Sequence, residues 1–232
     1  MTGIDATGLR AALAAAAERF RLEESRLNAL DGAIGDGDHG ITVRTGFDSI
    51  CSNTSALGAD ATIEAVLRHA GQTFMNSTGG AMGAIFGRML IAGGKALRGC
   101  ASIGPAEFHI MLAAMETAVS TAGKAVPGDK TILDAIHAAA AAEPQSTMGE
   151  SLRLAARQAS LAAAATASMI CRVGRASRLA ERAIGHPDPG AVSFSFFLEA
   201  LAGWFDPGAL ELSIESAPDV VHRRCLAGDQ DR

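Results

Sequence analysis

Residues 9–40 read LRAALAAAAERFRLEESRLNALDGAIGDGDHG and join a long helical pattern to an acidic, glycine-rich end. Apolar side chains recur in this stretch every seven residues, at Leu13, Phe20, Leu27 and Ile34. A spacing of seven returns to the same side of an α-helix after two turns, so these positions mark one buried stripe. The stretch therefore predicts a long amphipathic helix that ends near a polar loop.

Helical patterns of the same kind follow one another along the chain, with Gly or Pro at the breaks. Alanine-rich segments dominate, tyrosine is absent, and alternation typical of strands is hard to find. We expect helices at about 8–33, 40–52, 60–75, 79–98, 105–123, 131–143, 149–173 and 190–204. Thr131 followed by Asp134 fits a capping box at the start of one of them. Short links imply an antiparallel bundle that can hold a ligand where its loops converge.

The fold class predicted from these patterns is all-α. No shift in composition marks a linker, so residues 1–205 are expected to form one helical domain. Residues 206–232 form a polar C-terminal extension, which we expect to be partly disordered. The formal net charge of −5 comes with no basic block, which argues against nucleic acid or an anionic membrane as the main partner.

The cysteines and the apolar segments bear on the compartment. Cysteines are widely separated and form no C-x-x-C pair, as expected of reduced thiols in a cytoplasm; they are Cys51, Cys100, Cys171 and Cys225. The N-terminal segment lacks the pattern of an export signal. The uncharged window 70–87 reaches membrane-spanning length, but its polar residues and glycines argue against a membrane helix.

The carboxylates Asp31, Asp36 and Asp38 lie within eight residues of one another. Oxygen ligands crowded in this way repel one another unless a hard cation lies between them, and Mg²⁺ is usually held by a few carboxylates, water and substrate phosphates. Asp31 lies one turn beyond Leu27, near a helix C-terminus whose dipole disfavours negative charge. The cluster therefore suggests a metal ion and, through it, a nucleotide.

Other interpretations of this loop were weighed against the metal site. Gly35, Gly37 and Gly40 fit the dinucleotide pattern G-x-G-x-x-G, but a helical rather than a strand pattern precedes them. A calcium-binding EF-hand fails because Gly40 and Phe47 stand where oxygen ligands are required. A transition-metal site at His39 lacks a second His or Cys nearby. A solvated Gly-Asp turn that caps a helix stays open as the plain alternative.

A second loop, at residues 76–80, has features typical of an anion site. Ser77 and Thr78 supply hydroxyls, while Gly79 and Gly80 allow backbone N–H groups to approach a phosphate closely. The positive end of the following helix would face that anion. Simple N-capping of the helix is an equally good explanation of the same residues.

Two further segments have weaker patterns. The loop 126–131, VPGDKT, does not have the spacing of a phosphate-binding Walker A loop, and Lys130 is interpreted as a surface lysine. Arginines recur at helical spacing further on, at Arg172, Arg175, Arg178 and Arg182. Such a run is usually a solvated face, although one of its members could clamp a phosphate.

Four motifs occur in order along the chain: LDGAIGDGDHG, STGGAMG, GKAVPGDKTILDA and GRASRLAERAIGHPDPGA. Together they resemble the nucleotide-binding L subunit, or L domain, of dihydroxyacetone kinases over roughly residues 8 to 200. The resemblance implies a barrel of eight antiparallel helices. It also implies ADP or ATP, with two Mg²⁺ ions, bound across one end of the barrel.

The resemblance assigns roles to particular residues. The implied Mg²⁺ ligands are Asp31, Asp36 and Asp38. The residues implied to line the phosphates are His39, Gly40, Thr42, Ser77, Thr78 and Gly79. Those implied near the adenine are Gly123 and Ile132, while Arg175 and the turn of Asp188, Pro189 and Gly190 are implied to complete the site. The chain departs from the family at four positions: family members often carry Asn in place of Thr42, Ser in place of Asn76, Val in place of Thr78 and Met in place of Ile132.

The resemblance also implies a division of labour. Mg²⁺ would bridge the nucleotide phosphates and align a phosphoryl group for in-line transfer to a sugar hydroxyl, while the ketose is held by a histidine on a separate K subunit. No catalytic residue is therefore expected on this chain. The donor is either a phosphotransferase-system phosphocarrier that rephosphorylates bound ADP, with phosphoenolpyruvate as the ultimate source, or free ATP. An ATP-dependent kinase subunit for a four-carbon ketose such as erythrulose, and a non-catalytic nucleotide-binding regulatory module, remain alternatives.

Overall fold

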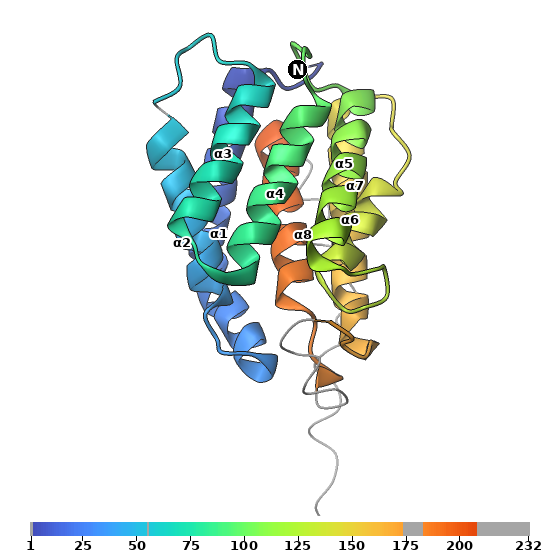
Figure 1. Ribbon diagram of the computed structural model, residues 1–232. Helices are drawn as coiled ribbons and strands as arrows, with labels where there is room; N and C mark the ends of the chain where they lie inside the picture. Colours follow the sequence, from blue (N-terminus) through green and yellow to red (C-terminus); the bar gives the residue numbers. More distant parts are fainter. Residues whose placement is uncertain (1, 55, 174–182, 208–232) are drawn as a thin grey trace, which may run out of the picture.

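The computed structural model describes residues 2–54, 56–173 and 183–207, and within these ranges the fold is all-α, as predicted (Figure 1). The α-helices are α1 (Ala6–Ile34), α2 (His39–Thr54), α3 (Ile63–Ser77), α4 (Gly80–Ala96), α5 (Pro105–Gly123), α6 (Ile132–Ala140), α7 (Met148–Ala165) and α8 (Pro189–Phe205). A 3-10 turn, η1 (Thr166–Ser168), follows α7. Extended pairing in the described residues is limited to an isolated bridge between Ile4 and Ile103.

The start of α6 shows how the sequence sets local structure. Thr131 accepts a hydrogen bond from the backbone of Leu133, and Asp134 returns one to the Thr131 N–H at 2.7 Å, which confirms the predicted capping box. The helix ends at Ala140, three residues before the expected boundary. Pro144 disfavours helical backbone at the residue before it, which accounts for part of this difference.

The end of α7 differs more from the prediction of a helix over 149–173. α7 ends at Ala165, and η1 then turns the chain away. Thr166 is fully buried and its hydroxyl donates back to the carbonyl of Ala163 at 2.5 Å. The Ala-rich pattern continues past this point without Gly or Pro until Gly174, so local sequence contained no stop signal.

The helices pack in chain order, each against the next, and α8 returns to pack against α1 as well as α6 and α7. The contacts therefore close into a ring. Aromatic side chains fill its middle: Phe47 of α2 contacts the rings of Phe20, Phe74, Phe86 and Phe197 at centroid distances of 4.6 to 6.0 Å. These rings come from α1, α3, α4 and α8, so one central residue joins five helices.

The seven-residue stripe predicted on α1 is buried throughout, with exposed fractions of 4% or less at Leu13, Phe20, Leu27 and Ile34. This burial turns one side of α1 toward the core and leaves its polar side at the surface. No described helix combines the length and apolar character that crossing a membrane requires.

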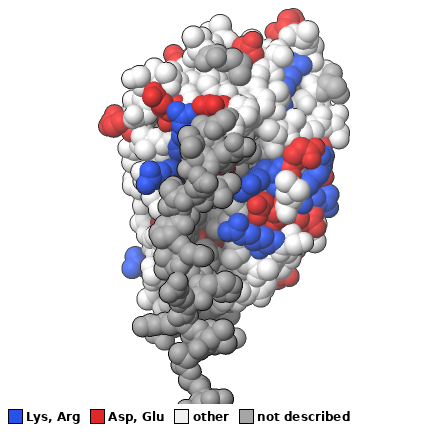
Figure 2. All heavy atoms as spheres, turned by 180° about the vertical axis from the view of Figure 1, so that it is seen from behind, with Lys and Arg blue, Asp and Glu red and all other residues white. Residues whose placement is uncertain are grey.

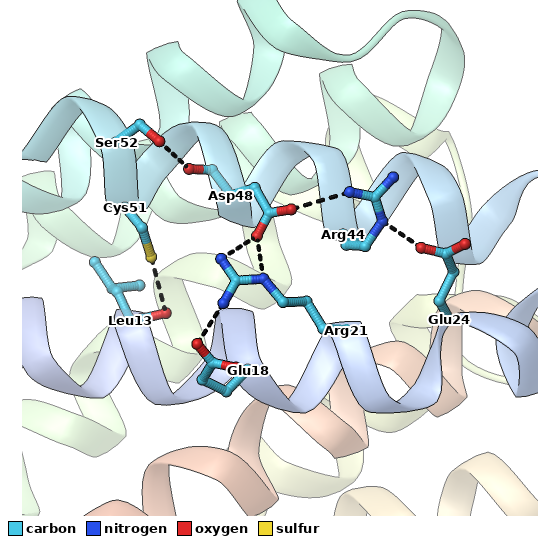
Figure 3. A network of polar contacts seen from close by, with 8 residues as sticks. All are labelled: Leu13, Glu18, Arg21, Glu24, Arg44, Asp48, Cys51 and Ser52. Atoms are coloured by element: carbon cyan, nitrogen blue, oxygen red, sulfur yellow. Dashed lines mark hydrogen bonds and ion pairs between the residues drawn. The ribbon is translucent and has the colours of Figure 1, made fainter.

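Ion pairs brace the outer sides of α1 and α2 (Figure 3). Arg21 of α1 donates to Asp48 of α2 from two nitrogens, at 2.8 and 2.7 Å. Arg44 of α2 pairs with the same Asp48 at 3.0 Å and with Glu24 of α1. Single exposed ion pairs contribute little to stability, but a shared network holds several side chains at once.

Acidic and basic side chains are intermixed on the face of the molecule seen from behind (Figure 2).

The loops that carry the predicted site residues lie at one end of the ring. The α1–α2 loop, the α3–α4 turn, the α5–α6 loop and the start of α8 all lie toward the lower end in Figure 1. Antiparallel neighbours necessarily place alternate connections at the same end. Residues far apart in the sequence are thus brought to one place.

Candidate functional site

The three acidic residues singled out from the sequence lie together. One carboxylate oxygen from each of Asp31, Asp36 and Asp38 lies within 4.8 Å of the other two. Oxygens bound to the same Mg²⁺ at 2.0–2.1 Å are about 2.9 Å apart when adjacent and about 4.2 Å apart when opposite, so three carboxylates that share one ion would have to draw closer together. A hard cation is the partner that an all-oxygen cluster of this charge fits.

Asp31 is the buried anchor of the cluster. It lies in the last turn of α1 and is half-buried, while Asp36 and Asp38 are exposed in the loop beyond. Its Oδ2 accepts the N–H groups of Gly37 at 2.8 Å and Asp38 at 3.1 Å, so it shapes that loop as well. Burial, together with the charges of Asp36 and Asp38, raises the pKa of Asp31 against the opposing effect of these hydrogen bonds.

Glycines permit the tight path of the α1–α2 connection. Gly37 adopts φ of 79°, a left-handed conformation that side chains disfavour. At Gly40 a Cβ would lie 2.2 Å from the carbonyl oxygen of Glu24 on α1. α2 can therefore begin close against α1, which places Asp38 and His39 beside Asp31.

A cavity of about 240 Å³ adjoins the cluster. It is lined by Asp31, Asp36, Asp38, His39, Thr42, Gly79, Gly80, Ala81 and Met82. Gly79 is the N-cap of α4 and makes no side-chain cap bond, and open space lies where a Cβ would stand at Gly79 or Gly80. The first N–H groups of a helix need acceptors, and an anion supplies them. The cavity thus joins a cation cluster to an uncapped helix N-terminus.

His39 links the cavity to α8. It is buried, and burial lowers its pKa to about 4, so the imidazole is neutral at physiological pH. Its Nε2 lies 3.2 Å from the hydroxyl of Ser193, and that hydroxyl donates to the carbonyl of Gly190 at 2.9 Å. Two hydrogen bonds therefore connect the metal side of the site to the start of α8. Ser193 was not anticipated from the sequence, where nothing separates it from an ordinary helical serine.

The remaining described residues that the resemblance assigns to the site form a second group. Ile132 begins α6, and a Cβ at Gly190 would lie 3.2 Å from the Cβ of Ile132, so the starts of α6 and α8 meet. Asp188 is the N-cap of α8 and accepts the N–H of Ala191 at 2.7 Å. Burial raises the pKa of Asp188 to about 7. Pro189 follows it as the first helical residue, and Gly123 ends α5.

Other predicted residues lie elsewhere or are not described. Ser77 is the last residue of α3, and both it and Thr78 donate their hydroxyl protons to the carbonyl of Phe74, at 3.3 and 2.7 Å. Neither of them is among the residues that line the cavity, nor is Gly40. Arg175 lies in 174–182, outside the described residues, so its role stays a prediction.

The interpretation of Lys130 as a surface lysine is wrong, because its exposed fraction is 1%. Its ammonium group reaches backbone carbonyls inside the fold, a placement that the isolated loop sequence does not indicate. Ala81 and Met82 were also missed as cavity residues, although both stand within the motif STGGAMG.

Comparisons with known proteins show which family and which relatives this chain is similar to. The DAK2 domain model matches residues 33–203. The chain is 37% identical over 188 residues to the PEP-dependent dihydroxyacetone kinase, ADP-binding subunit DhaL, of Escherichia coli (strain K12), covering 79% of this chain and 89% of that protein.

Longer relatives match over part of their length. The L-erythrulose kinase of Pectobacterium atrosepticum is 33% identical over 83% of this chain, which spans 34% of that protein. The human triokinase/FMN cyclase is 35% identical over 77% of this chain, which spans 32% of that protein. A crystal structure of the C. freundii dihydroxyacetone kinase superposes with a TM-score of 0.64 at 24% identity, over 87% of this chain and 34% of that one, which shows the shared fold.

Proposed function

The chain belongs to the dihydroxyacetone kinase L-subunit family, whose DAK2 domain it carries, and we propose that it is the nucleotide-binding subunit of a kinase for a short-chain ketose. The observation that carries the proposal is the cavity in which three clustered carboxylates face the uncapped start of α4. That pairing suits a ligand that is anionic and metal-bound at the same time. A nucleotide polyphosphate with Mg²⁺ has both properties.

Asp31, Asp36 and Asp38 would hold the metal, in line with the all-oxygen donors that Mg²⁺ prefers. We propose two Mg²⁺ ions, which when bound neutralise phosphate charge and align the phosphoryl group for in-line transfer. The aspartates act as ligands, and the hydrogen bonds from Gly37 and Asp38 keep Asp31 oriented toward the cluster. No side chain of this subunit is assigned as an acid, base or nucleophile.

ADP or ATP would place its phosphates between the acidic cluster and α4. The backbone N–H groups at Gly79 and Gly80 would bind phosphate oxygens, with His39 and Thr42 across from them and Gly40 next to His39 at the start of α2. Ser77 and Thr78 belong to the same turn. The nucleoside would extend toward the region where α6 and α8 meet, a region that the His39–Ser193–Gly190 chain joins to the phosphate side.

The nucleoside side would consist of Gly123, Ile132, Arg175, Asp188, Pro189 and Gly190. The crystal structure with the same fold is that of a kinase in complex with AMP-PNP and Mg²⁺, which supports a nucleotide and magnesium in this family. Asp188 is half-buried and its carboxylate caps the start of α8, so its contribution to nucleotide binding is made through the backbone of that turn.

The partner would be a K subunit that holds the ketose. The L-erythrulose kinase and triokinase relatives are about three times as long as the segment matched here, which is compatible with a second functional part in the same chain. In the relative from Escherichia coli, named as PEP-dependent and ADP-binding, the matched segment is nearly the whole subunit. This favours a donor scheme in which a phosphotransferase-system phosphocarrier rephosphorylates bound ADP. ATP as donor and erythrulose as acceptor form the alternative.

The test is reconstitution with the cognate K subunit. Dihydroxyacetone or erythrulose is supplied with either ATP or phosphoenolpyruvate plus the phosphocarrier proteins, and Mg²⁺-dependent ketose phosphate is measured. Slow release of ADP from the purified subunit supports the coenzyme scheme, whereas rapid exchange supports ATP. Nucleotide binding without transfer in any combination would leave the regulatory-module alternative and overturn the kinase role.

A further inference from the structure

Lys130 is the last residue of the α5–α6 loop, directly before the N-cap of α6, and its side chain is buried despite its charge. Its backbone adopts φ of 61°, a left-handed conformation that is uncommon for residues other than glycine. Buried lysines are rare unless their charge is compensated. The left-handed backbone and the burial of Lys130 both indicate a structural role inside the fold and not a role at the surface.

The ammonium group of Lys130 bonds to two separate parts of the chain. Nζ donates to the carbonyl of Ala183 at 2.7 Å and to the carbonyl of Met169 at 3.3 Å. Burial lowers the pKa of Lys130, while the nearby Asp188 carboxyl and the Cys171 thiol oppose that effect. The lysine is therefore a bridge between the segment after η1 and the segment before α8.

Backbone bonds join the same segments. The N–H of Arg172 donates to the carbonyl of Asp129 at 3.2 Å, and the N–H of Gly185 donates to the carbonyl of Ala167 at 2.8 Å. The N–H of Asp188 donates to the hydroxyl of Thr166 at 2.8 Å. The loop before α6, residues 166–172 and residues 183–188 thus form one hydrogen-bonded unit, and Lys130 reaches both of the other segments from the loop.

This unit supports the place where α6 and α8 begin. Ile132 follows Lys130 by two residues, Gly190 follows Asp188 by two residues, and the two helix starts lie in contact. We propose that Lys130 is a positioning residue that sets the separation of Ile132 and Gly190, and thereby shapes the nucleoside side of the site. The inference rests on the proposed nucleotide-binding function.

The phosphate side of the site is built from other elements. The acidic cluster depends on α1, the loop before α2 and the start of α4, and the ion pairs of Arg21 and Arg44 with Asp48 brace α1 against α2. The hydrogen bonds from His39 to Ser193 and from Ser193 to Gly190 are the described link between the two sides. A change at Lys130 should therefore weaken recognition of the nucleoside much more than the metal and polyphosphate contacts.

Lys130→Met removes the donors and keeps an unbranched side chain of similar length. We expect the affinity for Mg-ADP, measured by calorimetry, to fall about tenfold, as the loss of charged hydrogen bonds warrants. The affinity for Mg-tripolyphosphate, which has no nucleoside, should fall much less. Lys124→Met is the matched control, because Lys124 lies in the same loop with φ of 50° but is exposed.

Lys130→Arg separates hydrogen bonding from packing. Arginine retains donors for the two carbonyls but fits the space less well than methionine, so better ADP binding by the Arg variant than by the Met variant supports the bridge. If Lys130→Met does not fold, Lys130→Gln takes its place, with a smaller loss of ADP affinity expected.

Equal losses for ADP and tripolyphosphate, or no loss for either, would overturn the positioning role. Failure of the wild-type protein to bind Mg-ADP would overturn the proposed function and this inference with it, and the wild-type measurement identifies that case directly. Better ADP binding by the Met variant than by the Arg variant would show that Lys130 only fills space.

Discussion

Replacing Asp36 by Asn is expected to stabilise the metal-free protein and to remove the stabilisation that magnesium provides. The carboxylates of Asp31, Asp36 and Asp38 approach within 4.8 Å of one another, and the substitution neutralises one of them at almost constant shape. Two of the three repulsive pairs then disappear. The same change removes a ligand from the cation that would otherwise compensate the repulsion.

The magnitude follows from the distance. Two unit charges 4.8 Å apart repel by about 0.9 kcal/mol in a water-like dielectric, the value that suits the exposed position of Asp36. Two pairs come to about 2 kcal/mol before salt screening and to about 1 kcal/mol after it. Magnesium at a hundredfold excess over its Kd should stabilise the wild type by about 2.7 kcal/mol. The order of stability of the two proteins should therefore invert when the metal is added.

The assay is urea unfolding followed by far-UV circular dichroism, in EDTA and then in magnesium chloride with ADP. Asp60→Asn, at an exposed aspartate in the α2–α3 connection, is the control for loss of one surface charge. We expect the control to change little in either condition. The Asp36 variant should keep its helix content and lose Mg²⁺-dependent nucleotide binding.

Two results would refute the reasoning. If Asp36→Asn is no more stable than the wild type in EDTA, repulsion within the cluster is not the dominant interaction of Asp36 in the metal-free protein. If magnesium with ADP stabilises the variant as much as it stabilises the wild type, Asp36 is not a metal ligand.

Three further predictions concern stability. Burial raises the pKa of Asp188 to about 7, so the folded chain keeps a proton that the unfolded chain loses near pH 4. The stability of the wild type should therefore fall as the pH rises from about 4 to 7. Asp188→Asn should flatten this dependence when urea unfolding is measured across the pH range. Gly40→Ala would place a Cβ 2.2 Å from the Glu24 carbonyl oxygen, so we expect the free energy of unfolding to fall by about 1–3 kcal/mol in thermal melting. Mg²⁺ binding measured by calorimetry should weaken as well. An unchanged melting temperature would contradict the close approach of α2 to α1. Phe47→Ala should cost about 3–5 kcal/mol in chemical denaturation, since its buried ring contacts four others, and a loss below about 1 kcal/mol would show that the centre repacks.

Local pattern was a good guide to the helices. The stripe on α1, the capping box at Thr131 and Asp134, and the starts of α5 and α8 at proline all follow from interactions within a few residues. The end of α7 was predicted less well, because packing around the buried Thr166 ended a helix that the alanine-rich sequence would have continued.

The same difference between local patterns and long-range packing applies to the residues of the candidate site. Asp31, Asp36 and Asp38 are close in sequence, so their clustering was visible as a pattern and the structure brings them together. The link from His39 to Ser193 spans 154 positions, and no local pattern marks either residue as its partner. Long-range partners of this kind depend on which helices become neighbours.

The all-α class, the acidic cluster and the helix starts follow from the amino-acid sequence, because short-range periodicity and capping act within a few residues of the chain. The burial of Lys130 and the contact between the starts of α6 and α8 depend instead on how the helices pack. A lysine between Asp129 and Thr131 has the same local chemistry whether it faces water or two carbonyls. The carbonyls of Met169 and Ala183 reach it only after the helices have packed.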